Sequence, residues 1–159
     1  MSPEERQKLI EQYAKGPERV AASLEGFPAG GLTAHPIPGK WSAAEIIHHL
    51  SDSETISATR IRKIIAEPYP VIPGYDQDEF ARSLRYNERD PMPALENFRA
   101  VRAVTTELLR VLTEEEWVRQ AWHTEAGLFS AERWLRNYAI HAHNHAEQID
   151  RLRVALGGK

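Results

Sequence analysis

Cysteine is absent from this chain of 159 residues. Disulfide bonds, thiolate nucleophiles and thiolate metal ligands are therefore excluded, and any bound metal must use nitrogen or oxygen donors. The chain also lacks an apolar run approaching the roughly 18 residues of a membrane-spanning helix. Its N-terminal residues are charged and lack the apolar core of a signal peptide. We therefore expect a cytoplasmic protein with no membrane partner.

An excess of positive charge is also missing. The chain has 20 Lys and Arg against 23 Asp and Glu, and the positive residues are spread along the sequence. A surface for nucleic acid or for anionic lipid has no support in this composition, so a small-molecule substrate is the better expectation. The length suits a single domain covering residues 1–159.

Four long amphipathic segments are present, and none of the sequence shows a convincing alternating strand pattern. Caps and apolar periodicity predict helices over 2–24 (interrupted at Gly16-Pro17), 42–65, 91–112 and 130–156. The third is predicted to bury Leu95, Phe98, Val101, Val104, Leu108, Leu109 and Val111. Residues 121–129 form a hairpin or an irregular loop, and the long proline-rich loop over 67–90 could cover a pocket. We predict an all-α four-helix bundle with long loops between helices.

Two histidines, His141 and His145, lie four residues apart in the last predicted helix. At roughly 100° per residue, this spacing returns the second imidazole to within about 40° of the first, one turn along the axis. Both fall on the apolar face of the helix, whereas His143 points nearly to the opposite side. One divalent metal ion could be held by both imidazoles.

Adjacent histidines in the second predicted helix, His48 and His49, are the candidates for a third ligand. Neighbouring helical side chains point about 100° apart, so only one of them can serve the shared ion. His49 shares its helix face with apolar residues, whereas His48 shares its face with polar ones. The predicted inward set is therefore His49, His141 and His145.

Three imidazoles leave coordination positions open for water or substrate, which is typical of a catalytic metal site. The donor set favours Zn²⁺, Ni²⁺, Fe²⁺ or Co²⁺, with manganese as a further alternative. Imidazoles buried side by side each need a hydrogen-bond partner, and a shared metal satisfies both. Packed histidines without a metal are the alternative interpretation.

Two further residues are candidates for catalysis. Gln148 lies one turn beyond His145 on the same side, where it could bind a metal-bound water or orient a ligand. An ordinary polar residue near a helix end is the alternative. His123 lies in the loop before the last helix and is a candidate proton shuttle, with an exposed loop histidine as the alternative.

Other residues near these histidines have simpler interpretations. Asp52 and Glu54 follow His49 closely, and both are predicted to be solvated carboxylates on the helix surface. Trp41, Trp134 and Tyr138 are predicted to be aromatic residues of the core.

Several short motifs follow one another in a specific order: Gly39-Lys40-Trp41-Ser42, Ile47-His48-His49-Leu50, Pro73-Gly74-Tyr75-Asp76, Trp122-His123-Thr124-Glu125 and Tyr138-Ala139-Ile140-His141. In this combination they resemble the DinB/YfiT-like family, and the resemblance spans most of the chain. It implies a four-helix bundle in an up-down-down-up arrangement, often a homodimer. It also implies that His49, His141 and His145 hold a divalent ion, commonly zinc or nickel.

The same resemblance implies a metal-dependent hydrolase or an enzyme that transfers a low-molecular-weight thiol. In either case the metal would lower the pKa of water or of the thiol to generate a nucleophile. The thiol would be a separate small molecule, because the chain has no cysteine of its own. The alternative is a non-catalytic bundle that binds a metal or ligand in stress response or assembly.

Overall fold

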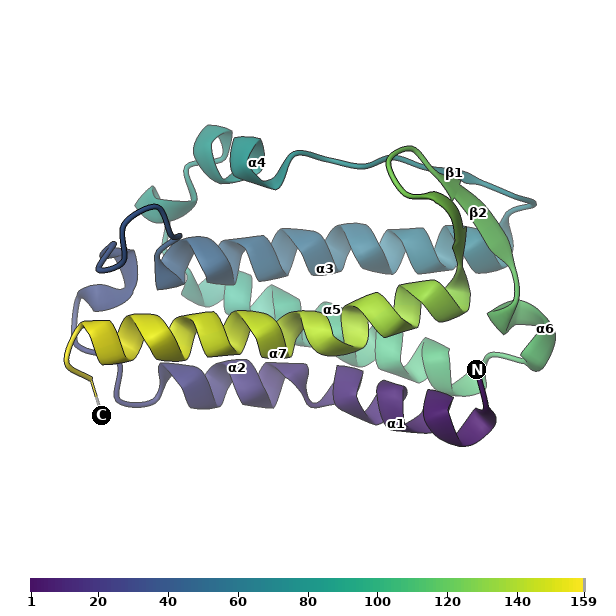
Figure 1. Cartoon of the computed structure of the whole chain (residues 1–159), viewed down its shortest axis with the longest axis horizontal. Coiled ribbons are helices and arrows are strands. Elements are labelled where there is room, and N and C mark those ends of the chain that lie inside the picture. Colours follow the sequence, from purple (N-terminus) through teal and green to yellow (C-terminus); the bar gives the residue numbers. More distant parts are fainter. Residues whose placement is uncertain (159) are drawn as a thin grey trace.

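The computed structural model describes residues 1–158 as a bundle of long helices with a small sheet at one end (Figure 1). The helices are α1 (Pro3–Ala14), α2 (Gly16–Leu24), α3 (Ala43–Ala66), α4 (Gln77–Ser83), α5 (Met92–Val111), α6 (Glu114–Trp117) and α7 (Ala131–Ala155). Two 3₁₀ turns, η1 (Gly31–Thr33) and η2 (Tyr86–Glu88), lie in the loops. The four-helix bundle predicted from periodicity is confirmed, with α1 and α2 together forming its first helix.

The bundle has an up-down-down-up arrangement, visible by following the chain colours in Figure 1. The α1 and α2 helices run one way, α3 and α5 both run back, and α7 returns in the first direction. Because α3 and α5 are parallel neighbours, the chain must cross the whole bundle between them. This crossover segment, residues 67–91, carries β1 (Val71–Ile72), α4 and η2.

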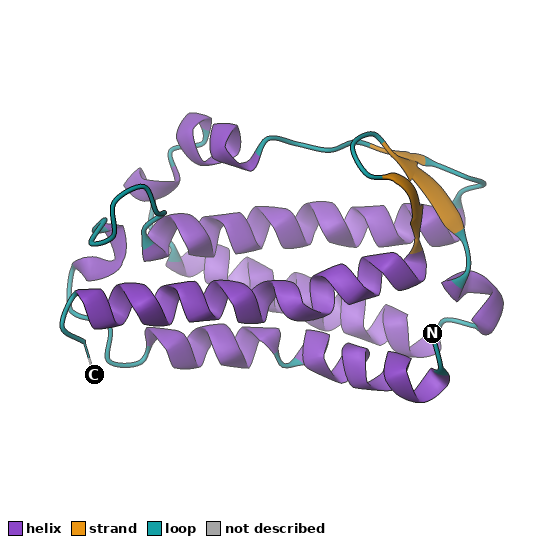
Figure 2. Ribbon diagram, in the orientation of Figure 1, coloured by secondary structure: helices purple, strands orange, loops and turns teal. Residues whose placement is uncertain are grey.

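A three-stranded sheet covers one end of the bundle (Figure 2). The β2 strand (Gln120–His123) and β3 (Gly127–Ser130) form an antiparallel hairpin, one of the two arrangements expected for this segment. The β1 strand pairs in parallel with β2, which places Ile72 opposite His123. The β1 strand was not predicted, because strands of two to four residues are too short to produce a clear periodic signal.

Serine side chains cap the N-termini of three helices, α1, α3 and α7. The Oγ atoms of Ser2, Ser42 and Ser130 each accept a hydrogen bond from the backbone N–H three residues later. At α3 the Glu45 carboxylate also accepts from the Ser42 backbone N–H at 2.7 Å, so the predicted capping box is present. This box fixes where α3 begins, at Ala43, six residues before His49.

We expect Ser42→Ala to lower the free energy of unfolding by about 1–2 kcal/mol. The change removes the cap of α3 and also the hydrogen bond that the buried Ser42 hydroxyl donates to Asn87 at 2.5 Å. Urea unfolding followed by circular dichroism measures the loss. Thr113→Ala is the matched control, because Thr113 caps only the four-residue α6. Equal losses in the two variants would contradict this account of Ser42.

Two apolar clusters fill the bundle, and a buried ion pair lies between them. One cluster contains Tyr13 and the other contains Phe98, and the Arg102 guanidinium stacks on both rings. Arg102 is fully buried, and its partner Glu54 is 1% exposed. The prediction of a solvated carboxylate is therefore wrong for Glu54. Asp52 is half-buried and accepts a hydrogen bond from the Tyr86 hydroxyl at 2.5 Å.

The α5 helix is rotated relative to the apolar stripe predicted for it. Val104 is 56% exposed and Val111 is 72% exposed, so their predicted burial is wrong. Arg102, Thr105 and Thr106 face inward instead. The rotation is explained by the ion pair, because burying Arg102 turns the valines on the other side of the helix toward solvent.

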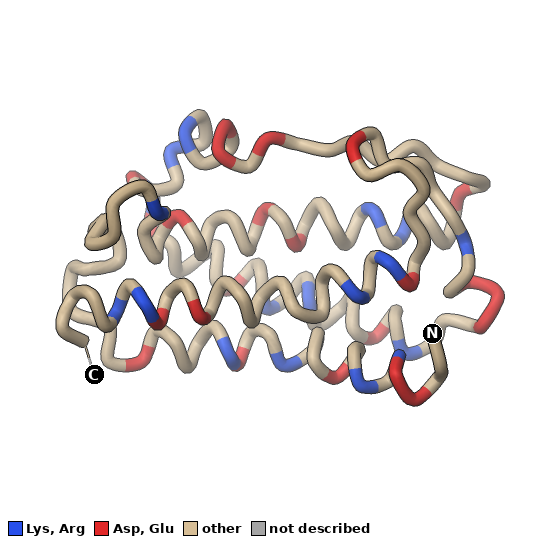
Figure 3. The backbone as a smooth tube through the Cα atoms, viewed as in Figure 1, with Lys and Arg blue, Asp and Glu red and all other residues tan. Residues whose placement is uncertain are grey.

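Lys and Arg residues and Asp and Glu residues are interspersed along the long helices, as Figure 3 shows. Within residues 1–158, no helix combines the length and apolarity needed to cross a bilayer.

Candidate metal centre

The three histidines predicted to face inward meet between α3 and α7. The Nε2 atom of His141 lies 3.4 Å from Nε2 of His49 and 3.2 Å from Nε2 of His145. One nitrogen from each ring can be chosen so that all three lie within 4.8 Å of one another. The helical spacing of His141 and His145 and the inward face of His49 together bring these rings to one point.

These separations fit a single metal ion. Two nitrogen ligands at 2.0–2.1 Å from a tetrahedral ion are about 3.3–3.4 Å apart. The two measured separations bracket this value. The same nitrogens would repel one another through their lone pairs if all three were unprotonated and nothing lay between them, and a shared cation removes that repulsion. The donor set is therefore suited to a divalent metal ion.

Burial keeps these imidazoles neutral. It lowers the pKa of His49 from 6.5 to about 3, with a further contribution from His145. It also holds the pKa of His141 well below its ordinary value, again with help from the other two rings. The pKa of His145 is lowered by burial as well, although its hydrogen bond to Gln148 opposes the shift. Neutral imidazole is the form with a lone pair for a metal.

Gln148 orients one of the three rings. Its Oε1 atom lies 2.9 Å from Nδ1 of His145 and accepts the hydrogen bond, so this ring carries its proton on Nδ1. The Nε2 atom that faces His141 is then left with its lone pair. A metal-binding histidine commonly donates its second ring N–H to an oxygen in this way.

We expect Gln148→Ala to weaken metal binding by about 10–100-fold, because the His145 ring loses the acceptor that fixes its tautomer and orientation. Competition against a chromogenic zinc chelator measures the change. Gln148→Glu, which keeps an oxygen acceptor, is expected to retain most of the affinity. Glu147→Ala is the matched control on the exposed side of α7. An unchanged affinity in Gln148→Ala would count against this role.

Two aromatic rings pack against the histidines. The Trp41 ring lies 4.9 Å from the His49 ring, and the Tyr138 ring lies 5.6 Å from the His141 ring in an edge-on arrangement, both measured between centroids. Tyr138 and Trp134 are buried as predicted. Trp41 packs against one core cluster as predicted, but it is only partly buried and also lines a pocket.

His123 lies apart from this cluster. It is the last residue of β2, and its Nδ1 atom accepts hydrogen bonds from the backbone N–H groups of Glu125 and Ala126 at 3.2 and 3.3 Å. It is only 7% exposed, so the alternative of an exposed loop histidine is wrong. Among residues 1–158, no hydrogen bond or ring contact joins it to the three histidines; its ring partner is Phe129. Its proposed part in proton transfer stays a prediction.

The remaining helical histidines face other groups. His48 stacks on Tyr86, and its Nε2 atom lies 3.4 Å from the backbone oxygen of Arg89. The Nε2 atom of His143 lies 2.9 Å from the backbone oxygen of Gln12 on α1. The choice of His49 over His48 and of His141 and His145 over His143 therefore agrees with the contacts seen.

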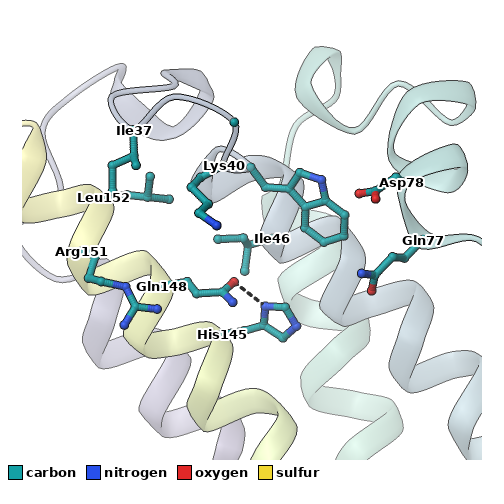
Figure 4. Close-up of a pocket in the computed structure, with 11 residues that line it drawn as sticks. Ile37, Lys40, Ile46, Gln77, Asp78, His145, Gln148, Arg151 and Leu152 are labelled. Atoms are coloured by element: carbon teal, nitrogen blue, oxygen red, sulfur yellow. Dashed lines mark hydrogen bonds between the residues drawn. The ribbon is translucent and has the colours of Figure 1, made fainter.

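A pocket of about 390 Å³ opens directly beside His145 and Gln148. Figure 4 shows its walls, which come from α7, from the loop before α3 and from α4. Gln77 and Asp78 at the start of α4 line one side, so the crossover segment does reach the pocket, as its length suggested. The pocket gives a small molecule room next to the histidine cluster.

The lining residues Lys40 and Arg151 were not singled out in the sequence. Each carries a positive charge into the pocket, one from the loop before α3 and one from α7. A signal for Arg151 was available, because it follows Gln148 by three residues and so lies on the same side of the helix. Lys40 lies in a loop, where spacing carries no such information.

Comparisons with known proteins agree with this geometry. A profile of the DinB superfamily matches residues 12–149. YfiT of Bacillus subtilis, for which metal-dependent hydrolase activity has been proposed, is 26% identical over 99% of this chain and 89% of its own length. A protein of Oceanobacillus iheyensis with the same proposed activity is 32% identical over 72% of this chain and 66% of its own length.

The solved structure of Bacillus subtilis YfiT is similar to this fold throughout. It superposes with a TM-score of 0.92 and covers 100% of this chain and 91% of its own, at 26% sequence identity. That structure is described as an unusual four-helix bundle topology. The parallel α3 and α5 helices and the crossover between them are the features of this chain that depart from a simple up-down-up-down bundle.

Proposed function

The chain belongs to the DinB superfamily, and on that basis we propose that it is an enzyme that uses a divalent metal ion to activate water or a low-molecular-weight thiol. The observation that carries the proposal is the convergence of three neutral imidazole nitrogens beside an open pocket. The relatives for which metal-dependent hydrolysis has been proposed also support a metal-dependent enzyme. Hydrolysis would use hydroxide, and thiol transfer would use a thiolate from a second small molecule.

Each residue at the site has a distinct part in this proposal. His49, His141 and His145 would hold the ion, and Gln148 fixes the ring of His145 through its hydrogen bond to Nδ1. A divalent ion in such a site supplies Lewis acidity and lowers the pKa of bound water to about 7. Trp41 covers His49 on the pocket side and limits the access of bulk water.

The test compares metal-free and metal-loaded protein on two kinds of reaction. Zinc, nickel, manganese, iron and cobalt are added separately to metal-free protein. Hydrolysis is then measured on aryl esters and amides, and thiol transfer is measured as the conjugation of a small thiol to a chlorinated aromatic electrophile. We expect turnover that requires metal and is lost in His141→Ala.

The same assays separate the alternatives. Ester or amide cleavage without a thiol identifies a hydrolase, whereas a rate that depends on the thiol concentration identifies a transferase. The competing proposal of a non-catalytic bundle predicts no metal-dependent turnover with either class of substrate. It also predicts that His145→Ala changes thermal stability or oligomer size alone. That result would overturn the proposal of an enzyme.

A further inference from the structure

Two cations in the pocket have no carboxylate partner. Within residues 1–158, neither the Lys40 ammonium nor the Arg151 guanidinium forms an ion pair or a hydrogen bond with another residue. Other cations on the same helix are engaged, since Arg153 pairs with Asp150 and Arg136 pairs with Glu5. The pocket therefore offers two unneutralised positive charges to whatever enters it.

Both charges lie on the path to the histidine cluster. In Figure 4 the Lys40 side chain points into the pocket above Gln148, and Arg151 extends from α7 on the other side of Gln148. Along α7 the pocket is lined by His145 and Gln148, which are half-buried, and then by Arg151, which is exposed. Six residues separate His145 from Arg151, so they are displaced by about 9 Å along the helix axis.

The other residues that line the pocket do not neutralise the positive charges of Lys40 and Arg151. Ile37, Ile46 and Leu152 provide apolar surface, and Gln77 is uncharged. Asp78, the one carboxylate among the lining residues of the described chain, stands on the opposite wall at α4 (Figure 4). Two cations and one carboxylate leave a local charge of about +1, in a chain whose net charge is −3. A monoanion is attracted to this position more strongly than a neutral group.

We propose that Lys40 and Arg151 form a carboxylate subsite, so that the substrate of this site carries a carboxylate at a distance on the order of 9 Å from its reacting group. Arginine suits this role because its guanidinium donates two parallel hydrogen bonds to a carboxylate. Lysine adds a mobile point charge that adapts to the ligand. The apolar lining residues Ile37, Ile46 and Leu152 provide surface against which a hydrocarbon linker can pack. This inference rests on the proposed function, since it names the class of substrate for the same site.

The probes are hydroxamates whose alkyl chain ends in a carboxylate, each compared with the same hydroxamate ending in a neutral amide. The hydroxamate end chelates a divalent ion, and the alkyl length is varied in steps. Isothermal titration of zinc-loaded protein measures the affinity of each pair. We expect the carboxylate member to bind at least about 10-fold more tightly at an intermediate chain length, and to lose this advantage when the chain is too short to reach Arg151.

Variants identify the residues responsible. Lys40→Met or Arg151→Met is expected to reduce the preference for the carboxylate probe by about 10-fold while leaving the affinity for the amide probe unchanged. Lys40→Arg keeps the charge and is expected to keep the preference. Lys8→Met on α1 and Arg110→Met on α5 are the matched controls, because they remove the same charges outside the pocket. Equal effects of pocket and control variants would overturn the subsite.

A second measurement keeps this inference separate from the proposed function. Nuclear magnetic resonance follows the Arg151 Nε–H and the Lys40 backbone amide while a dicarboxylate or its diamide is added to metal-free protein. Chemical-shift changes that the dicarboxylate causes and the diamide does not, and that disappear in Lys40→Met, would support the subsite. This holds even if the protein binds no metal and the proposed function fails. Metal binding together with equal affinities for the charged and neutral probes overturns the subsite and leaves the proposed function standing.

Discussion

We expect His141→Ala to reduce the bound metal from near one ion per chain to a small fraction of that, whichever divalent ion is supplied. The Nε2 atom of His141 is the one that approaches both other ligands, at 3.2 and 3.4 Å, so its loss leaves two nitrogens on different helices. Losing a metal ligand is expected to weaken metal binding by at least about 100-fold, which is more than the loss expected when only a hydrogen-bond partner of a ligand, such as Gln148, is removed. Elemental analysis by mass spectrometry measures the metal on untagged protein purified without chelator or nickel resin.

The chain provides two matched controls for this experiment. His143→Ala removes a histidine two positions away whose ring bonds to the Gln12 backbone, and His48→Ala removes the neighbour of His49. Both variants are expected to retain the metal, whereas His49→Ala loses it as His141→Ala does. An absence of metal from the wild type, even after reconstitution with zinc or nickel, would be incompatible with the assigned site.

Arg102→Met is expected to lower the free energy of unfolding by about 3–5 kcal/mol. Arg102 donates to the Glu54 carboxylate at 2.9 Å and to the backbone oxygens of Tyr13 and Tyr138 at 3.2 and 3.1 Å. These contacts join α5 to α3, α1 and α7. Methionine keeps part of the volume but leaves a buried carboxylate without its cation. Urea unfolding followed by circular dichroism measures the loss.

Two further variants test whether the unpaired charge of Glu54 causes the loss of stability in Arg102→Met. Glu54→Leu combined with Arg102→Met leaves no buried ion, so this double variant is expected to be more stable than Arg102→Met alone. Arg99→Met, three residues earlier on the exposed side of α5, is expected to change the stability by no more than about 0.5 kcal/mol. If the double variant is less stable than Arg102→Met, the stability lost in Arg102→Met comes from disturbed packing rather than from the unpaired charge of Glu54.

The stability of Arg102→Met is also expected to depend on pH. Burial raises the pKa of the Glu54 carboxyl above 4.5 in the native protein, even though Arg102 lowers it, and removing Arg102 raises it further. When the pKa of a group is higher in the native than in the unfolded state, the group's contribution to the free energy of unfolding is complete below the unfolded pKa. This contribution is lost as the pH rises through the native pKa. The deficit of Arg102→Met relative to wild type is therefore expected to shrink as the pH is lowered from neutral toward 4.5.

The helices and the histidine cluster were predictable because each depends on local rules. Ser42 and Glu45 mark the start of α3 through a capping box that two residues fully specify. The convergence of His141 and His145 follows from a spacing of one helical turn, and the choice of His49 follows from the apolar residues that share its face. These rules need no knowledge of which helices are neighbours.

The features that were missed depend on contacts between distant segments. A carboxylate such as Glu54 is solvated unless an opposite charge is buried with it, and its partner Arg102 lies 48 residues away on another helix. The β1 strand is defined only by its pairing with β2, and Lys40 lines the same pocket as Arg151 only because a loop folds onto α7. The sequence contains these residues but carries no local signal of their pairing.

The wide separation of the metal ligands along the chain makes the ion a reporter of docking between helices. His141 and His145 belong to one helix, but His49 lies 92 residues before His141 and joins them only when α3 packs against α7. An unfolded chain, or one in which only the last helix has formed, presents at most two of the three nitrogens. Tight binding of an ion would therefore require the completed tertiary structure, and the bound ion would stabilise that structure over every partly assembled form by mass action. In a refolding experiment, we expect capture of the ion to coincide with the last cooperative step, after most of the helical signal has appeared.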